Sequence, residues 1–276
     1  MGNGSIAQIK VKRVSVGKLV DDDDELAVEE PLEIQLSYGN SVEPRKKSIS
    51  VTMRTPGCDR ELAVGFLFTE GIIKNRSQVS DVQPVAFAEN KIVVTLVANE
   101  SPRLQKSERN FYTTSSCGVC GKSSIEAIRS VSVYENGPDE MRVKAGQFYG
   151  LQAALLGQQD VFESTGGLHA SALFDLHGNF VMLREDVGRH NALDKVIGAA
   201  FLDDRLPLDK EMLLLSGRAS FELVQKAAMA GIKIVASVGA PSSLAMQLAQ
   251  ESGITLIGFL RNERFNIYSG DQRVVI

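Results

Sequence analysis

The chain has 276 residues, of which 43% are hydrophobic and 23% are charged. This composition is typical of a globular protein with one large or two modest domains, and it excludes disordered, collagen-like and low-complexity classes. Thirty Lys and Arg residues against 34 Asp and Glu residues give a net charge of −4, which disfavours duplex nucleic acid and an anionic membrane as partners.

The first part of the chain predicts a tail followed by a small α+β subdomain. Residues 1–30, which include the acidic run 21–25, are treated as a tail or edge segment. Beyond them, apolar residues first alternate with polar ones and then recur at helical spacing. The polar stretch 101–110 predicts a linker or exposed loop. The subdomain spans residues 31–110, with strands at 32–36, 47–53 and 92–97 and a helix at 59–69 followed by Gly71.

The remaining residues, 111–276, predict an α/β domain. Short apolar segments alternate with helical segments of about ten residues, which indicates right-handed β-α-β crossovers and a parallel sheet covered on both faces. The predicted strands span 211–215, 232–238 and 254–260, and the predicted helices span 192–200, 221–230 and 242–251.

The sequence contains no visible targeting signal. The first ten residues lack the apolar segment of a secretory signal, and no apolar run reaches the roughly 18 residues that a membrane span needs. Three cysteines are too few, and odd in number, for a disulfide framework. We expect a soluble cytoplasmic protein without a membrane partner.

The pair Cys117 and Cys120 is the sharpest chemical feature of the sequence. Their Cys-x-x-Cys spacing lets two sulfurs share a metal, form a disulfide or pass a sulfur atom between them. Reactivity depends on a thiolate, which Lys122 and the start of a helix would favour. The alternative is a pair of unreactive turn cysteines, which is also how we interpret Cys58.

A zinc deaminase is one interpretation of the pair, with His169 as the third ligand. Such enzymes combine His-x-Glu with Pro-Cys-x-x-Cys. Here Ser171 stands at the glutamate position and Ser116 at the proline position. Without the carboxylate no group can shuttle the proton, so deamination is disfavoured and no metal site is predicted.

Two other interpretations of the segment remain. Residues 121–123 resemble the end of a phosphate-binding P-loop, but that motif requires glycine where Ser116 stands, so the match is weak. In a sulfur-transfer interpretation one cysteine carries a persulfide and the other assists, which needs neither glutamate nor metal.

Several turns predict an anion-binding edge. Donor-rich segments precede helices, where backbone N–H groups favour anions, and two follow strands whose carboxyl ends meet at one edge. A final loop with two arginines could recognise a phosphate and a purine edge. Simple turns or charged surface loops would use similar residues. The candidates are Arg189 and His190, Ser216, Gly217 and Arg218, Gly239 and Ser242, and the loop 261–265.

Taken together, these segments resemble the FdhD family of formate dehydrogenase accessory sulfurtransferases. The resemblance runs in order from about residue 31 to the end of the chain. Its matching stretches are TPGCDRELAVGFLFTEGII at 55–73, SSCGVCGK at 115–122, GGLHASALFD at 166–175, EDVGRHNALDKVIG at 185–198, SGRASFELVQKAAMAGI at 216–232, GAPSSLAMQLA at 239–249 and GFLRNERFNIY at 258–268.

The resemblance implies a sulfur carrier. An IscS-type cysteine desulfurase would load a persulfide on Cys117, with Cys120 assisting. The sulfur would pass to the bis(molybdopterin guanine dinucleotide) molybdenum cofactor before insertion into formate dehydrogenase. A cofactor chaperone without sulfur transfer is the alternative. The segment implied to contact the cofactor comprises Phe259, Leu260, Arg261, Asn262, Glu263 and Arg264.

The resemblance also implies a fold and an assembly. Residues 111–276 would form a cytidine-deaminase-like three-layer α/β/α domain that carries the Cys-x-x-Cys loop, next to the smaller N-terminal α+β subdomain. The chain would form a homodimer.

Overall fold

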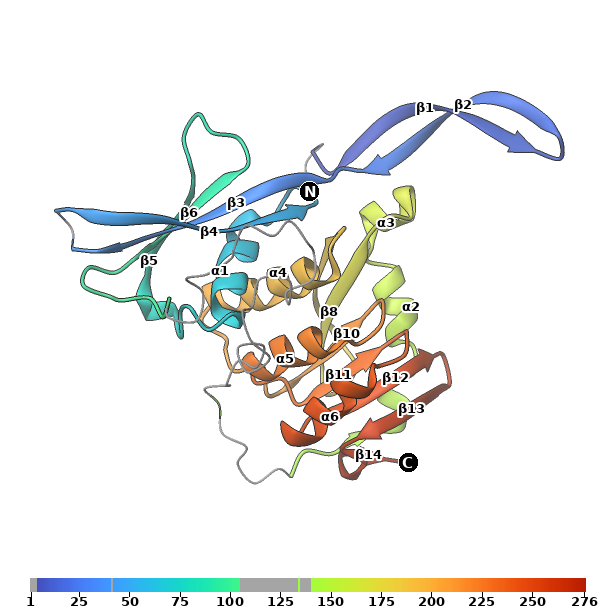
Figure 1. Cartoon of the computed structure of the whole chain (residues 1–276). Helices are drawn as coiled ribbons and strands as arrows, with labels where there is room; N and C mark the ends of the chain where they lie inside the picture. Colours follow the sequence, from blue (N-terminus) through green and yellow to red (C-terminus); the bar gives the residue numbers. More distant parts are fainter. Residues whose placement is uncertain (1–3, 41, 105–133, 135–139) are drawn as a thin grey trace.

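The computed structural model describes residues 4–40, 42–104, 134 and 140–276. Figure 1 shows a mixed α/β molecule with several sheets. Among the described residues no helix has both the length and the apolar character needed to cross a membrane. The strands are β1 (Ile6–Ser15), β2 (Lys18–Ala27), β3 (Glu30–Gly39), β4 (Pro44–Arg54), β5 (Val79–Pro84), β6 (Lys91–Leu96), β7 (Val143–Lys144), β8 (His169–Asp175), β9 (Phe180–Asp186), β10 (Glu211–Leu215), β11 (Ile234–Ser237), β12 (Thr255–Arg261), β13 (Arg264–Ser269) and β14 (Val274–Val275).

Among the described residues, three short 3-10 turns accompany the α-helices. The α-helices are α1 (Asp59–Thr69), α2 (Leu151–Leu156), α3 (Asp160–Thr165), α4 (Arg189–Leu202), α5 (Phe221–Met229) and α6 (Ser243–Glu251), and the 3-10 turns are η1 (Arg76–Gln78), η3 (Ala145–Gln147) and η4 (Asp271–Arg273).

A six-stranded sheet organises the second half of the chain, in the order β13-β12-β11-β10-β8-β9. The predicted strands and helices of this region are present. The prediction of a parallel sheet is correct only for β10, β11 and β12; β8, β9 and β13 run antiparallel to their neighbours. The reason is connection length, since the short turns after β8 and β12 can join only antiparallel strands.

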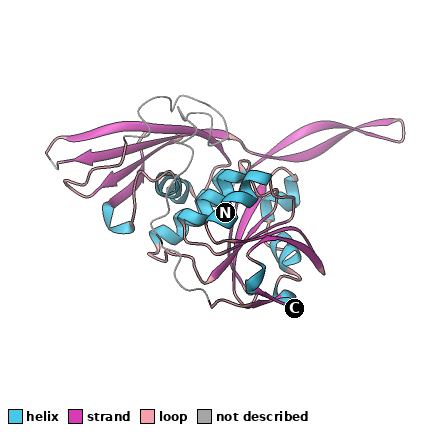
Figure 2. Cartoon of the chain, turned by 60° about the horizontal axis from the view of Figure 1, so that its bottom comes forward, coloured by secondary structure: helices cyan, strands magenta, loops and turns pink. Residues whose placement is uncertain are grey.

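Helices and loops cover both faces of this sheet. On one face Leu213 and Leu215 of β10 join a hydrophobic cluster with residues of α4, α5 and α6. On the other face Met212 and Leu214 pack in a second cluster with Leu151 of α2. Figure 2 shows the helices distributed on both sides of the strands.

The front sheet has the order β4-β3-β6-β5 and is backed by α1. Leu32, Ile34 and Leu36 alternate along β3 and are at most 1% exposed, as the sequence pattern predicts. Helix α1 has the predicted bounds, and Gly71 just beyond it adopts a left-handed φ of 72°, a usual way to end a helix. The predicted strands and helix of this region are therefore confirmed.

Helices α1 and α4 join the two parts of the molecule through a close backbone crossing. A Cβ atom built on Gly65 of α1 would overlap the carbonyl oxygen of Asp194, and one built on Gly198 of α4 would overlap that of Glu61. Only glycine allows two helices to approach this closely. One hydrophobic cluster consequently continues from the front sheet through both helices to the six-stranded sheet.

Strands β1 and β2 form a hairpin that projects from the body as an arm (Figure 1). The sequence treats this segment as a tail, whereas in the structure its two strands pair antiparallel and carry cross-strand charge pairs. Lys10 pairs with Asp23 at 3.0 Å and Lys12 with Asp21 at 2.6 Å, and Arg13 pairs with Asp22. The acidic run therefore faces the basic side chains of β1.

The α1–α4 crossing yields a stability prediction. We expect Gly65→Ala to lower the free energy of unfolding by about 3 kcal/mol or more, because the added methyl overlaps backbone that cannot move aside. The measurement is urea unfolding monitored by circular dichroism. The matched control is Gly146→Ala, since a Cβ at this exposed glycine meets no atom within 4 Å. Equal effects of the two substitutions would contradict the role of the crossing.

Candidate functional site

The turns of the predicted ligand edge lie together at one edge of the sheet. The carboxyl ends of β10, β11 and β12 lie at the same edge of the sheet because these strands are parallel. The chain turns there into α5 and α6 or into β13. Strand β9 runs in the same direction, so the first turn of α4 also lies at this edge. Carboxyl ends of parallel strands and starts of helices together favour anionic ligands.

Hydrogen bonds tie the turns of this edge to one another. The Gly239 N–H donates to the Gly217 carbonyl at 2.9 Å, and the Phe259 N–H donates to the Gly239 carbonyl at 3.1 Å. A Cβ on Gly239 would lie 2.9 Å from Cγ of Arg218, so glycine is needed for this approach. The Ser242 hydroxyl caps α6 by accepting from the Ala245 N–H. Its oxygen therefore already has a partner in the fold.

The segment 259–264 forms the end of β12 and the tight turn into β13. Phe259 is 44% exposed with a left-handed φ of 54°, next to a register shift in the ladder. Leu260 is fully buried in the second hydrophobic cluster, so only its backbone can face a ligand. Arg261, Asn262, Glu263 and Arg264 are exposed. The structure thus places five of the six predicted side chains in solvent reach.

The two arginines of this turn differ in their contacts. Arg261 donates from Nη1 to the carbonyls of Val238 and Leu260, both at 2.8 Å, which ties the turn to the end of β11. For Arg264 the described structure shows neither a hydrogen bond nor an ion pair. Arg261 therefore shapes the turn, and Arg264 offers its guanidinium to an anion.

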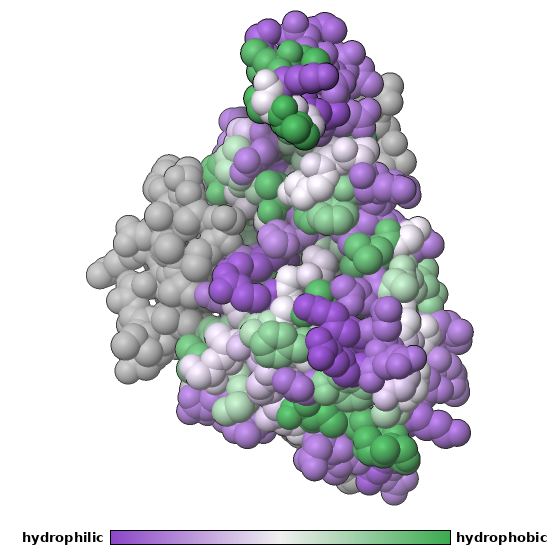
Figure 3. Space-filling view, turned by 90° about the vertical axis from the view of Figure 1, so that its right-hand side faces the viewer, coloured by the Kyte–Doolittle hydropathy of each residue, from purple (hydrophilic) through white to green (hydrophobic). Residues whose placement is uncertain are grey.

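Three adjoining hollows form a groove along this edge. The first, about 400 Å³, lies between α2, α3 and the sheet edge and is lined by His169, Ser216 and Gly217. Gln152 and Leu156 of α2 connect it to a wider, open hollow beside residues 261–264. A third hollow continues over Phe259. Figure 3 looks onto this side of the molecule and shows hydrophilic residues interspersed with apolar ones.

Helix α2 forms a groove wall that the sequence analysis does not predict. Gln152 is an amide that could meet a heterocyclic ligand, and the exposed Leu156 could supply an apolar contact. Helix α2 has only six residues, too few for a recognisable helical period. A polar residue between apolar ones, as at Gln152, is the one available signal, and it is weak.

The start of α4 brings His169, Arg189 and His190 together. Burial lowers the pKa of His169, and its electrostatic interactions with Arg189 and His190 lower it further. His190 is buried, with Nε2 3.9 Å from a carboxylate oxygen of Glu222 on α5. These side chains and Ser216, Gly217 and Arg218 lie at one edge, as the sequence predicts.

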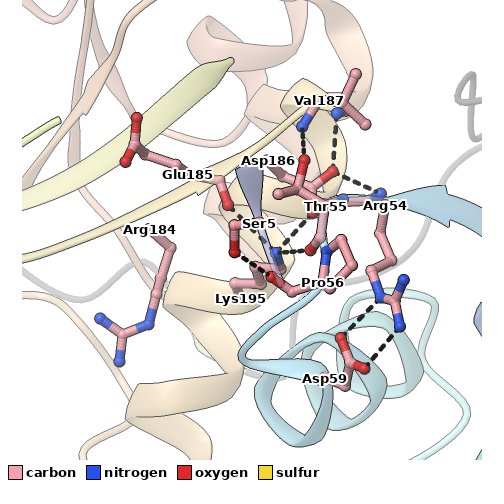
Figure 4. Close-up of polar contacts among 12 residues, drawn as sticks. Ser5, Arg54, Thr55, Pro56, Asp59, Arg184, Glu185, Asp186, Val187 and Lys195 are labelled. Atoms are coloured by element: carbon pink, nitrogen blue, oxygen red, sulfur yellow. Dashed lines mark hydrogen bonds and ion pairs between the residues drawn. The ribbon is translucent and has the colours of Figure 1, made fainter. Parts of the chain in front are cut away.

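A buried polar network holds the start of α4 against the front sheet (Figure 4). Lys195 donates to Asp186 at 2.7 Å, to the Thr55 carbonyl at 2.9 Å and to the Glu185 carbonyl at 3.2 Å. The Thr55 N–H donates to Asp186, and the Val187 N–H donates to the Thr55 hydroxyl. Burial raises the pKa of Asp186, and the Lys195 ammonium opposes this shift.

The network extends to the base of the arm and to α1. Ser5 donates to the Pro56 carbonyl at 2.9 Å, and Arg54 donates to both carboxylate oxygens of Asp59 at 2.9 and 3.0 Å. Cys58 lies between these residues at the start of α1, half-buried, and burial raises the pKa of its thiol. This agrees with its interpretation as an unreactive turn cysteine.

The cysteine pair itself, Cys117 and Cys120, lies outside the described residues. Among the residues that the structure does describe, no group of three His, Cys, Asp or Glu side chains could hold a metal ion.

The fold and the candidate site describe a mixed α/β protein with a groove at the carboxyl edge of a partly parallel sheet. The family model of the FdhD/NarQ family matches residues 27–275. The sulfur carrier protein FdhD of Mycolicibacterium paratuberculosis is 49% identical over 272 residues, covering 96% of this chain and 97% of the relative. That of Mycobacterium tuberculosis is 46% identical over 278 residues, covering 97% and 98%. The chain therefore belongs to the FdhD/NarQ family.

A solved structure has the same fold. The crystal structure of a protein from Desulfotalea psychrophila, described as a formate dehydrogenase accessory protein, has a TM-score of 0.75 at 24% identity. The match covers 98% of this chain and 100% of that one.

The buried network yields a second prediction. We expect Lys195→Met to lower the free energy of unfolding by about 3–5 kcal/mol, because it leaves the Asp186 carboxylate buried without its cation. Chemical unfolding of the full chain measures this. Lys12→Met, which removes an exposed pair on the arm, should change stability by less than about 1 kcal/mol. A small effect of Lys195→Met would mean that Asp186 is neutral in the fold.

Proposed function

We propose that this protein accepts sulfur as a persulfide on Cys117 from an IscS-type cysteine desulfurase. It then delivers the sulfur to the bis(molybdopterin guanine dinucleotide) molybdenum cofactor, before the cofactor enters formate dehydrogenase. Membership of a family whose curated relatives are named sulfur carriers supports the general role. The observation that supports the cofactor is the groove at the sheet edge. Seven of the predicted contact residues line it: Ser216, Gly217, Phe259, Arg261, Asn262, Glu263 and Arg264.

The groove suits an elongated anion. Arg264 and the starts of α4, α5 and α6 supply donors along one edge, and Gln152 and Phe259 offer an amide and an aromatic face for a heterocycle. A cofactor with two guanine dinucleotides carries phosphates and purines at separate points, so an extended groove is the shape that it requires. We assign guanine and its phosphates to the turn 259–264.

The sulfur chemistry balances with two thiols. The Cys117 thiolate attacks the outer sulfur of the desulfurase persulfide, a new S–S bond forms, and the donor cysteine leaves as a thiolate. In the second step the Cys120 thiolate attacks Sγ of Cys117. The outer sulfur leaves as hydrosulfide for the cofactor, and the two cysteines, now joined in a disulfide, have supplied two electrons. A cellular thiol then reduces the disulfide.

Three finer features belong to this proposal. The second half of the chain would share the layering of cytidine deaminases, the protein would act in the cytoplasm, and it would form a homodimer. In this proposal the deaminase chemistry has been lost, consistent with Ser171 at the position of the catalytic glutamate.

The sulfur step has a direct test. After incubation with a cysteine desulfurase and cysteine, we expect mass spectrometry to find one additional sulfur atom on the peptide that contains Cys117 and Cys120. Cys117→Ala should abolish that addition and the maturation of formate dehydrogenase. Cys58→Ala is the matched control and should change neither, since burial raises the pKa of that thiol and so disfavours its reactive thiolate form. Maturation by Cys117→Ala with a sulfurated cofactor would favour the alternative of a chaperone without sulfur transfer.

The cofactor contact has a separate test. We expect Arg264→Gln to weaken binding of GDP, a fragment of the cofactor, by about tenfold or more in isothermal titration, because it removes a charge-assisted hydrogen bond. Arg45→Gln, on the exposed part of β4 in the other sheet, should leave affinity unchanged. Equal affinity of all three proteins would remove the turn 259–264 from the cofactor site.

A further inference from the structure

The hollow between α2, α3 and the sheet edge differs in chemistry from the hollow beside the turn 259–264. Its volume of about 400 Å³ is in the range of small-molecule sites, and none of the residues that line it is Lys, Arg, Asp or Glu. The neighbouring hollow is lined by Arg261, Glu263 and Arg264. Phosphates bind best where a guanidinium is within reach, so the first hollow suits an uncharged part of a ligand.

His169 lines this hollow from the first position of β8. Its imidazole is half-buried, and the structure shows no hydrogen bond between either ring nitrogen and the described residues. A Cβ atom built on Gly217 would lie 3.5 Å from Nδ1 of His169, which places the ring against the turn that follows β10. Burial lowers the pKa of His169 and so favours the neutral ring, which has one N–H donor and one acceptor nitrogen.

Two further polar groups line the same hollow. The Ser216 hydroxyl accepts from the Ala170 N–H at 2.8 Å, and the described part of the chain shows no acceptor for its own proton. Gln152 of α2 is partly exposed, and its amide makes no hydrogen bond that the described residues show. Together with His169, these groups offer both donors and acceptors to a ligand in the hollow.

Apolar side chains supply much of the remaining lining. Phe162 of α3 is half-buried, yet it belongs to neither hydrophobic cluster, so its ring is not committed to the core. Leu156 of α2 is 49% exposed, and Val238 follows the end of β11. Apolar and aromatic walls with a few polar groups are typical of sites for flat heterocycles, which stack on a ring and hydrogen-bond at their edge.

We propose that this hollow binds a flat, uncharged heterocycle of the aminopyrimidinone type, and that His169 recognises its polar edge. Pterins and guanine share this edge. The inference deepens the proposed function and rests on it for the natural ligand. Because the turn 259–264 is assigned to guanine and its phosphates, the hollow takes the pterin of the cofactor. The two hollows share Gln152 and Leu156, so one extended molecule can occupy both.

The test measures binding of free pterin to the full-length protein by the fluorescence of the pterin, which no tryptophan emission overlaps in this chain. We expect His169→Ala to weaken pterin binding by about tenfold or more, because it removes the hydrogen-bonding ring. Phe162→Ala should weaken it by about fivefold or more through loss of stacking. Both should leave GDP affinity within about twofold, whereas Arg264→Gln should weaken GDP binding and leave pterin binding unchanged.

The matched control is a second histidine. His177 is exposed in the turn between β8 and β9, at the other end of β8, and His177→Ala should change neither affinity. Thermal unfolding of each variant verifies its fold, and Phe162→Ala, whose ring lies outside both hydrophobic clusters, provides the measurement if His169→Ala is unstable. Failure of the wild-type protein to bind pterin, or wild-type pterin affinity in both site variants, would overturn the proposal.

Competition with guanosine decides which heterocycle the hollow takes. We expect excess guanosine to leave pterin bound. Displacement of pterin by guanosine, with parallel loss of both in His169→Ala, would overturn the pterin assignment and make the hollow the guanine site.

Retention of the molybdenum cofactor tests the natural ligand. His169→Ala should retain less cofactor than His177→Ala, and equal retention would exclude the pterin of the cofactor as the occupant. Sulfur loading of Cys117 by a desulfurase should be normal in His169→Ala, since the pterin hollow takes no part in that step. The pterin site and the sulfur-transfer proposal can therefore fail independently.

Discussion

The crossing of α1 and α4 determines where the rest of the molecule can lie. The backbones touch at Gly65 and Gly198, where a side chain on either helix would overlap the other. Closer to the end of α1, Thr69 donates to Asp194 of α4 at 2.8 Å, and Lys226 of α5 donates to the same carboxylate at 2.9 Å. Three helices are thereby fixed around one buried ion pair, whose removal from either side would leave a charge in the core.

The crossing of α1 and α4 also determines where the predicted ligand edge lies. Helix α4 leads from the crossing to the edge, and Lys195 binds Asp186 and the Thr55 carbonyl just behind the first turn. The start of α4 is therefore attached to the front sheet as well as to β9. Because the edge turns are also hydrogen-bonded to one another, a ligand meets donors whose geometry exists before binding, which lowers the entropic cost of association.

Much of the fold could be predicted from the sequence because its strands and helices have clear periods. The bounds of α1 and β10 agree with the prediction, since apolar spacing and a following glycine or turn mark both. The direction of β8 and β13 could not be predicted, because it depends on which strand each one joins. The burial of Lys195 and Lys226 could not be predicted either, since a lysine within a helix ordinarily indicates an exposed face.

The site was predictable to the extent that it lies in turns. Glycine and serine after a strand indicate a ligand edge, and the structure joins those turns. The wall formed by α2 and the burial of Leu260 depend on tertiary packing, for which a local pattern carries no information. Arg189 is similar: the sequence shows a cation at the start of a helix, but only the fold shows that its Nε is buried without a hydrogen-bond partner among the described residues.

The overall charge of the chain bears on how it would bind the proposed polyanionic cofactor. The net charge of −4 would by itself repel a cofactor rich in phosphates. This repulsion is weak, because exposed charges are screened over about 8 Å at physiological salt. Four consecutive aspartates contribute most of the local negative charge, and three of them pair with Lys10, Lys12 and Arg13 on the arm. In the proposed binding mode, the exposed Arg264 and the helix-start N–H groups of this edge would instead meet the cofactor at short range. The attraction of hydrogen-bond donors in a groove for a bound anion is stronger than a weak, screened repulsion from the net charge. The local geometry of the groove is therefore a better guide to the ligands of this protein than its net charge.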